Sequence, residues 1–202
     1  MKPFLIFFIF TFAVLFLPAD TKASVLQEGS SGEQVTELQE TLFHLGYLPV
    51  SPTGYYGALT EEAVRSFQAD FSLQTDGAAG PITLQKADNV SVMARVVYGE
   101  ARGESYEGQV AVAAVILNRI KDPGFPSDVR GVVFQRNAFT AVHDGQYYLT
   151  PNQTAYKAVR DAHLGSDPSQ GSTYYYNPDI ATSQWIFSRS TVTRIGKHLF
   201  AE

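Results

Sequence analysis

The chain contains no cysteine, and this absence constrains its fold more than any other feature. Without disulfides, each folded unit must bury enough apolar surface to be stable by itself. The same absence excludes a cysteine nucleophile and a thiolate metal site. A length of 202 residues suffices for one ordinary domain or two small ones, and apolar and charged fractions of 45% and 17% are typical of a globular protein.

The first 23 residues have the layout of a secretory signal peptide. Lys2 supplies a positive start, residues 4–17 form an almost unbroken apolar run, and small residues occupy the two positions that a signal peptidase reads before Ser24. The run is short for a membrane-spanning helix, and an uncleaved N-terminal anchor is the alternative. We expect residues 1–23 to be a signal peptide, cleaved after Ala23, and the mature protein to be secreted without a membrane span.

The charge of the chain excludes one class of partner. The formal net charge is −5, and removal of the predicted signal peptide leaves about −6. No basic stripe is available to displace the counterions of phosphates, so a nucleic-acid partner is not expected. A neutral or sugar-rich partner fits this charge better.

Residues 25–88 are predicted to form a compact unit of three helices. Ser31 forms a capping box with the glutamine three residues later, an apolar face follows at helical spacing, and Gly46 ends this helix as a C-cap. Thr60 is placed to cap a second helix. Pro81 suits the first position of a third.

The same segment resembles the peptidoglycan-binding-domain-1 family over nearly its whole length. The motifs that carry the resemblance are, in order, Leu38-Gln39, Leu45-Gly46-Tyr47, Gly54-Tyr55-Tyr56-Gly57, Thr60, Ala63-Val64, Phe67-Gln68, Asp76-Gly77 and Gly80-Pro81-Ile82-Thr83. The resemblance implies a three-helix, non-catalytic module that binds peptidoglycan.

A second domain is expected over residues 92–202, after a very short joint at residues 88–90. Ser91 is expected to cap a helix that ends near Gly103, and apolar residues within 110–117 predict the next helix. The short joint implies that the two domains lie close together.

The rest of the second domain combines one more helix with strands. Thr150 is placed to cap a helix that continues to Gly165. Beyond it, residues 173–176, 185–187 and 198–200 are β-prone and separated by turn residues. The expected fold class is therefore α+β, with helices first and a small antiparallel sheet at the end.

Glu100 is the candidate catalytic acid. Cleavage of a glycosidic bond requires a carboxylic acid that stays protonated near neutral pH, and burial or a negative field raises a carboxyl pKa. Glu100 is expected in the last turn of a helix, where the macrodipole is negative, with Gly99 and Gly103 leaving room for a polymer to approach. An exposed glutamate at a helix end is the alternative on this pattern alone.

Other carboxylates are candidate partners of Glu100. Glu104 and Glu107 follow Glu100, and Asp144 and Asp179 lie in Gly- or Pro-rich loops where they could serve as a second carboxylate or merely as turn residues. The histidines have no metal-ligand spacing, and neither a GxSxG nor a phosphate-binding loop is present. We therefore expect no metal and no cofactor.

Aromatic residues crowd the C-terminal part of the chain. Side chains alternate along a strand, so Tyr175 should face away from Tyr174 and Tyr176. One face can then join the core while the other stacks on the apolar C–H faces of sugars.

Residues 92–202 resemble the spore cortex-lytic enzyme family of cell-wall hydrolases. The motifs are residues 94–104 and 107–119, then Ala138-Phe139-Thr140-Ala141-Val142, Tyr174-Tyr175-Tyr176-Asn177-Pro178-Asp179, residues 181–186 and residues 194–198. The resemblance implies a lysozyme-like, lytic-transglycosylase-like catalytic domain with Glu100 as its catalytic glutamate. It also implies a set of cleft residues, namely Glu104, Thr140, Tyr148, Tyr175, Asn177 and Trp185.

These expectations define a function with stated alternatives. The chain is expected to be a secreted enzyme that cleaves the glycan backbone of peptidoglycan by lytic transglycosylation, in the cell wall or the spore cortex. The alternatives are muramidase hydrolysis with Asp144 or Asp179 serving a water, and a non-catalytic wall-binding protein. The spore enzymes carry a longer segment between their domains, so a vegetative wall substrate also stays open.

Overall fold

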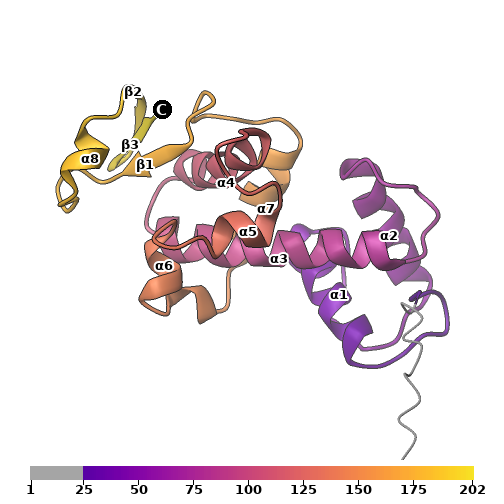
Figure 1. Cartoon of the computed structure of the whole chain (residues 1–202). Coiled ribbons are helices and arrows are strands. Elements are labelled where there is room, and N and C mark those ends of the chain that lie inside the picture. Colours follow the sequence, from indigo (N-terminus) through magenta and orange to yellow (C-terminus); the bar gives the residue numbers. More distant parts are fainter. Residues whose placement is uncertain (1–24) are drawn as a thin grey trace, which may run out of the picture.

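A computed structural model describes residues 25–202, so the signal peptide predicted at residues 1–23 lies outside the described residues. The described chain is mostly helical and ends in a small antiparallel sheet, which confirms the expected α+β class (Figure 1). No helix in this part of the chain is long and apolar enough to cross a membrane.

The N-terminal module contains α1 (Glu33–Leu45), α2 (Ala58–Asp70) and the first half of α3 (Pro81–Ala101). Gly46 adopts a left-handed conformation at φ 87° and is the C-cap of α1, as predicted. Pro81 is the first residue of α3, also as predicted.

The predicted side-chain caps of the first two helices are wrong. Gly32 and Gly57 precede α1 and α2, and neither helix has a side-chain cap. Thr60 lies instead inside the module, where its hydroxyl accepts a hydrogen bond of 2.8 Å from Gln39 Nε2. A buried amide requires such partners, and this requirement overrides the capping preference of threonine.

The predicted joint at residues 88–90 is also wrong, because α3 runs without interruption for 21 residues through both modules (Figure 1). Ser91 does not cap a helix, and its hydroxyl lies 3.3 Å from the Tyr156 hydroxyl. Val90, within the expected joint, and Met93, just after it, are both buried. Continuous burial stabilises the helix where the local pattern predicted a break.

The remaining elements complete the C-terminal domain. They are α4 (Tyr106–Lys121), α5 (Val129–Val133), α6 (Thr140–His143), the 3-10 helix η1 (Gln146–Tyr148), α7 (Gln153–His163), β1 (Tyr174–Tyr176), α8 (Gln184–Phe187), β2 (Thr191–Ile195) and β3 (His198–Ala201). Ser105 caps α4 and Asn152 caps α7, so the start predicted at Thr150 is wrong.

The three strands pair in the order β1-β3-β2, and all pairs are antiparallel. Tyr175 pairs with Phe200 in this register. The strand predicted over residues 185–187 is wrong, because Trp185 and Phe187 belong to α8 and pack their rings against Tyr174 and Tyr176. Tertiary contacts override the β-propensity of these aromatic residues.

One continuous core joins the two modules. Buried residues of α1, α2, α3, α4 and α7 belong to the same hydrophobic cluster. At the junction the rings of His44 and Tyr156 stack at 4.9 Å, and Phe71 meets His163 at 4.7 Å. The N-terminal module therefore shares both a helix and a core with the C-terminal domain.

Candidate active site

Glu100 lies in the last turn of α3, at the point where α6 meets this helix. Its Oε1 atom accepts a hydrogen bond of 2.6 Å from the backbone N–H of Ala141 in α6. The close approach depends on Gly99, where a Cβ atom would lie 2.5 Å from the Cβ atom of Ala141. The missing side chain at Gly99 therefore allows α6 to approach α3 at this point.

Tyr175 approaches Glu100 from the sheet, and its hydroxyl donates a hydrogen bond to the carboxylate. The Tyr175 ring packs against Phe200 at 5.8 Å. Its strand neighbours face the other way, Tyr174 against Trp185 at 5.1 Å and Tyr176 against Phe187 at 5.6 Å. The predicted alternation along this strand is confirmed.

Burial raises the pKa of Glu100 above its ordinary value of 4.5. The hydrogen bonds from Ala141 and Tyr175 lower this pKa, and the charge of Asp144 raises it. Because burial is the largest of these causes, the carboxyl group keeps its proton to a higher pH than an exposed glutamate does. A proton held in this way is what a general acid must supply.

Asp144 is a carboxylate whose charge acts on Glu100. Among the hydrogen bonds of the described residues there is none between the two. The side chain and the backbone N–H of Gln146 donate to Asp144, and these bonds lower the pKa of Asp144. Asp144 is therefore ionised at neutral pH, while burial makes Glu100 keep its proton to a higher pH than usual. Asp179 lies in a turn, where its N–H donates to Asn177 Oδ1 at 3.0 Å.

A buried arginine, Arg119, lies close enough to Glu100 and Tyr175 for their charges to act on it. Arg119 Nε donates to the Thr173 carbonyl at 2.7 Å, and its guanidinium lies 4.9 Å from the ring centroid of Phe139. Burial lowers the pKa of Arg119, whereas the charges of Tyr175 and Glu100 raise it. Sequence reasoning missed this residue, because a lone arginine at a helix end carries no signal of burial.

A hollow of about 260 Å³ opens beside Glu100. The residues that line it are Gly99, Glu100, Arg102, Gly103, Glu104 and Gln146. Of the predicted cleft residues, this hollow contains Glu104, and Thr140 begins the helix that donates to Glu100. Arg102 and Gln146 were not predicted, since each is an ordinary polar residue in the sequence.

Glu104 also supports the sheet. Its Oε2 atom accepts a hydrogen bond from the backbone N–H of Lys197 at 3.2 Å, in the turn between β2 and β3. A Cβ atom on Gly196 would clash with the same oxygen. The Glu104 carboxylate therefore connects the loop after α3 to the hairpin.

Three other predicted cleft residues do not line the hollow beside Glu100. Trp185 is half-exposed and has the Arg189 guanidinium 4.6 Å from its ring centroid. Asn177 forms the turn after β1. Tyr148 is 77% exposed and lines a different hollow, between the two modules.

Within residues 25–202 no three His, Asp or Glu side chains are grouped closely enough to hold a metal ion.

Comparisons with known proteins agree with both halves of this architecture. The Cell Wall Hydrolase family model matches residues 103–201, and the Putative peptidoglycan binding domain model matches residues 31–86. A spore cortex-lytic enzyme of Bacillus cereus is 42% identical, over 88% of this chain and 86% of the relative. One from Oceanobacillus iheyensis is 38% identical, over 88% of this chain and 87% of the relative.

A solved structure supports the same relationship. The catalytic domain of the germination-specific lytic transglycosylase SleB from Bacillus anthracis is 58% identical and superposes with a TM-score of 0.55, over 57% of this chain and 94% of that chain. Since the similarity to the complete relatives extends over most of both sequences, this chain belongs to the spore cortex-lytic enzyme family of cell-wall hydrolases.

Proposed function

We propose that this protein cleaves the bond between N-acetylmuramic acid and N-acetylglucosamine in peptidoglycan by lytic transglycosylation, with Glu100 as its single acid and base. The observation that carries the proposal is the buried, hydrogen-bonded carboxyl group of Glu100, whose pKa is raised by burial. A protonated acid of this kind can donate to the leaving oxygen.

The reaction requires one carboxyl group in two roles. Glu100 donates its proton to the glycosidic oxygen as the bond from C1 of N-acetylmuramic acid breaks. The resulting carboxylate, stabilised by the Ala141 N–H and the Tyr175 hydroxyl, then takes the proton of the 6-hydroxyl of the same sugar. The O6 atom bonds to C1, so the products are a 1,6-anhydro end and a free 4-hydroxyl, and no water is consumed.

The N-terminal module supplies the second part of the function. Its match to a peptidoglycan binding domain supports peptidoglycan as the partner. We propose that the residue 25–88 module attaches the enzyme to the polymer, and that residues 92–202 cut it. Secretion through the residue 1–23 signal peptide, and a location in the cell wall or spore cortex, complete this assignment.

Muramidase hydrolysis is the second candidate, and Asp144 is the observation that favours it. Asp144 is ionised and its charge acts on Glu100, so it could serve a water molecule. Asp179 has no comparable relationship with Glu100 among the described residues. The non-catalytic alternative receives no support from a chain in a family of cell-wall hydrolases.

Product masses separate the candidates. Purified sacculi are digested with the mature protein, and the soluble fragments are analysed by mass spectrometry. Transglycosylation predicts anhydro ends, which are lighter by one water than the reducing ends that hydrolysis produces. If only reducing ends are found, the reaction is hydrolysis by Glu100 and Asp144. If no fragments are released, the enzymatic assignment is overturned.

A further inference from the structure

A groove of about 650 Å³ lies between the two modules, apart from the hollow that contains Glu100. We call it the interdomain groove. Its lining comes from α1 of the N-terminal module, from α3, and from α5, η1 and α7 of the C-terminal domain. Neither module could form this groove alone.

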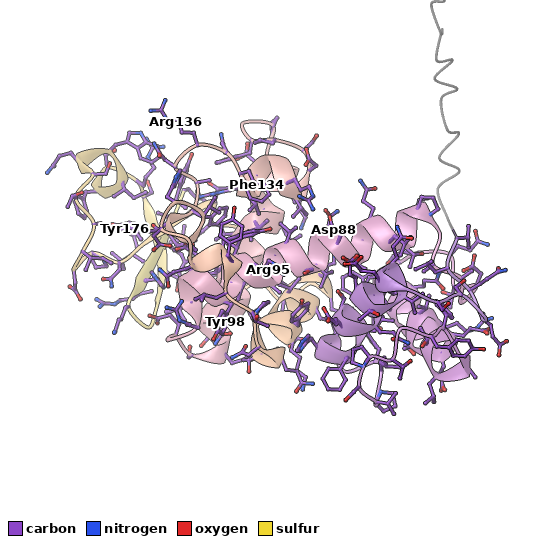
Figure 2. The ribbon with its side chains drawn as sticks, turned by 90° about the horizontal axis from the view of Figure 1, so that it is seen from below. Asp88, Arg95, Tyr98, Phe134, Arg136 and Tyr176 are labelled. Carbon is purple, nitrogen blue, oxygen red and sulfur yellow. The ribbon has the colours of Figure 1, made fainter. Side chains whose placement is uncertain are left out.

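Arg95 in α3 is a cation of this groove that has no acidic partner among residues 25–202. It is half-buried, its guanidinium lies 6.0 Å from the ring centroid of Tyr147, and it forms no ion pair with any carboxylate of residues 25–202. The nearby Arg130, by contrast, pairs with Asp88 at 2.9 Å. Figure 2 shows Asp88, Arg95 and Tyr98 following one another along α3. A guanidinium has several N–H donors in one plane, and a carboxylate is the group that matches them.

The α1 side of the same groove has the opposite charge. Glu37 and Glu40 line it, both are exposed, and neither forms an ion pair within the described chain. Tyr156 also lines the groove, and both Arg95 and Glu40 act electrostatically on its hydroxyl. A ligand with a carboxylate and an amine would complement the two sides of the groove.

The interdomain groove and the hollow at Glu100 lie within reach of each other. Arg95 and Glu100 are five residues apart on one helix, so their side chains leave it about 7.5 Å apart along the axis and about 140° apart around it. The 3-10 helix η1 borders both spaces, since Gln146 lines the hollow while Tyr147 and Tyr148 line the groove. The two spaces are therefore adjacent at η1.

We propose that the interdomain groove binds the stem peptide of an N-acetylmuramic acid residue whose glycan is held at Glu100. A peptide carboxylate pairs with Arg95, the side-chain amine of a diamino acid in the stem lies against Glu37 and Glu40, and the exposed ring of Tyr148 covers the chain. Stem peptides carry both charges, which is the combination that the groove presents. This inference rests on the proposed function, because it needs a peptidoglycan substrate.

The test compares two forms of the same polymer. The protein is the mature chain with Glu100→Gln, which holds the polymer without cutting it. One probe is insoluble sacculi with their stem peptides, and the other is the same sacculi after an N-acetylmuramoyl-L-alanine amidase has removed the stems. Dissociation constants are measured by co-sedimentation, and the parent should bind the stem-bearing form at least about tenfold more tightly.

Three variants in this background locate the preference. Arg95→Gln should abolish the preference for stems, and Tyr148→Ala, a change at an exposed position, should reduce it by about threefold or more. Arg136→Gln is the matched control, because it removes an exposed arginine that projects from the outer edge of the molecule (Figure 2). It should keep the preference. Added salt should weaken the preference in the parent but not in Arg95→Gln.

The outcomes separate this inference from the function on which it rests. If the wild-type protein releases anhydro fragments while the parent binds both polymers equally, the groove assignment is overturned and the transglycosylase assignment stands. If Arg95→Gln folds normally and keeps the full preference for stems, the groove assignment is likewise overturned. If the wild-type protein releases nothing from either polymer and binds neither, both assignments fall.

Discussion

Gly99 and Ala141 are packed so closely that a Cβ atom on the glycine would lie 2.5 Å from the Cβ atom of the alanine. This contact brings the N-terminus of α6 against the last turn of α3. The Ala141 N–H can then reach Glu100 Oε1 at 2.6 Å. The position of the Glu100 carboxyl group therefore depends on a missing side chain one residue before it.

Gly99→Ala should damage both stability and catalysis. The added methyl group displaces α6, and overpacking of this kind costs about 1–3 kcal/mol of the free energy of unfolding. Loss of the hydrogen bond to Glu100 should lower the rate of muropeptide release by roughly tenfold or more. Gly80→Ala, at the other end of α3, is the stability control, because a Cβ atom added there would meet no neighbouring atom within 4 Å. It should change the free energy of unfolding by less than about 1 kcal/mol. Equal losses in the two variants would contradict the explanation.

Tyr175→Phe should shift the pH dependence of activity. The Tyr175 hydroxyl lowers the pKa of Glu100, so its removal raises that pKa further. Activity is lost as pH rises through the pKa of the acid, and this limb of the pH–rate profile should move to higher pH. The rate at the optimum should fall roughly ten- to hundredfold, because the carboxylate formed after proton donation loses a donor. A limb that stays in place or moves to lower pH would be evidence against the contact.

Glu100→Gln should abolish activity while stabilising the fold at neutral pH. General acid–base catalysis contributes about 10²–10⁴-fold, so turnover should fall at least that far. The folded-state pKa of Glu100 is raised, so the folded protein loses stability as pH increases from about 4.5 through that pKa. A glutamine does not ionise, and the gain in melting temperature should appear at pH 7 and vanish at pH 4.

Glu107→Gln is the control for this pair of measurements, because Glu107 is exposed at the start of α4. It should keep both its activity and its melting temperature. Glu104→Gln should lose less activity than Glu100→Gln, although it weakens the contact with Lys197. A folded Glu100→Gln protein with near wild-type release of anhydro fragments would falsify the mechanism and direct attention to Asp144.

Local signals predicted the parts of the fold that local chemistry determines. Gly46 ends α1 because only its missing side chain makes the left-handed conformation inexpensive, and Pro81 begins α3 because its ring fixes the helical φ angle. Ser91 carried an equally clear local signal, but burial of its neighbours continues the helix. A sequence pattern does not report such burial.

The candidate site was predicted in part. Glu100 followed from its helix-end position and from a family resemblance, and Tyr175 was placed among the cleft residues. The Ala141 N–H could not be predicted, since a backbone donor 41 residues away is identified only by the fold. Tyr148 was also placed among the cleft residues, but the sequence does not reveal that it borders the interdomain groove instead.

His163 should make the junction of the modules sensitive to acid. Its ring meets Phe71, and burial, followed by the charges of Lys86 and Lys121, lowers its pKa from 6.5 to about 4. The unfolded chain therefore binds a proton first as pH falls from 6.5 to 4, and stability is lost in that window. With allowance for partial exposure the loss is about 1–3 kcal/mol. The melting temperature should fall further between pH 7 and pH 4.5 in the wild type than in His163→Phe, which keeps the ring contact without the titration.

Asn89→Pro should test whether the uninterrupted helix couples the modules. A proline inside a helix costs about 3 kcal/mol or more, which corresponds to roughly 6–12 °C of melting temperature for a protein of this size. Because the modules share one core, a single unfolding transition should move as a whole. Asn89→Ala should leave it within about 2 °C. A second transition that stays at the wild-type temperature would show that the modules unfold independently.

The continuous α3 also determines where on the wall such an enzyme can act. From Pro81 to Glu100 the helix extends roughly 30 Å without a joint. A catalytic domain on a flexible tether could search a wide area around one attachment point, but a domain on a stiff rod reaches only bonds at a fixed distance and direction from it. Each time the enzyme binds, it can then cut only at one distance from its attachment point. It must dissociate and bind again before the next cut.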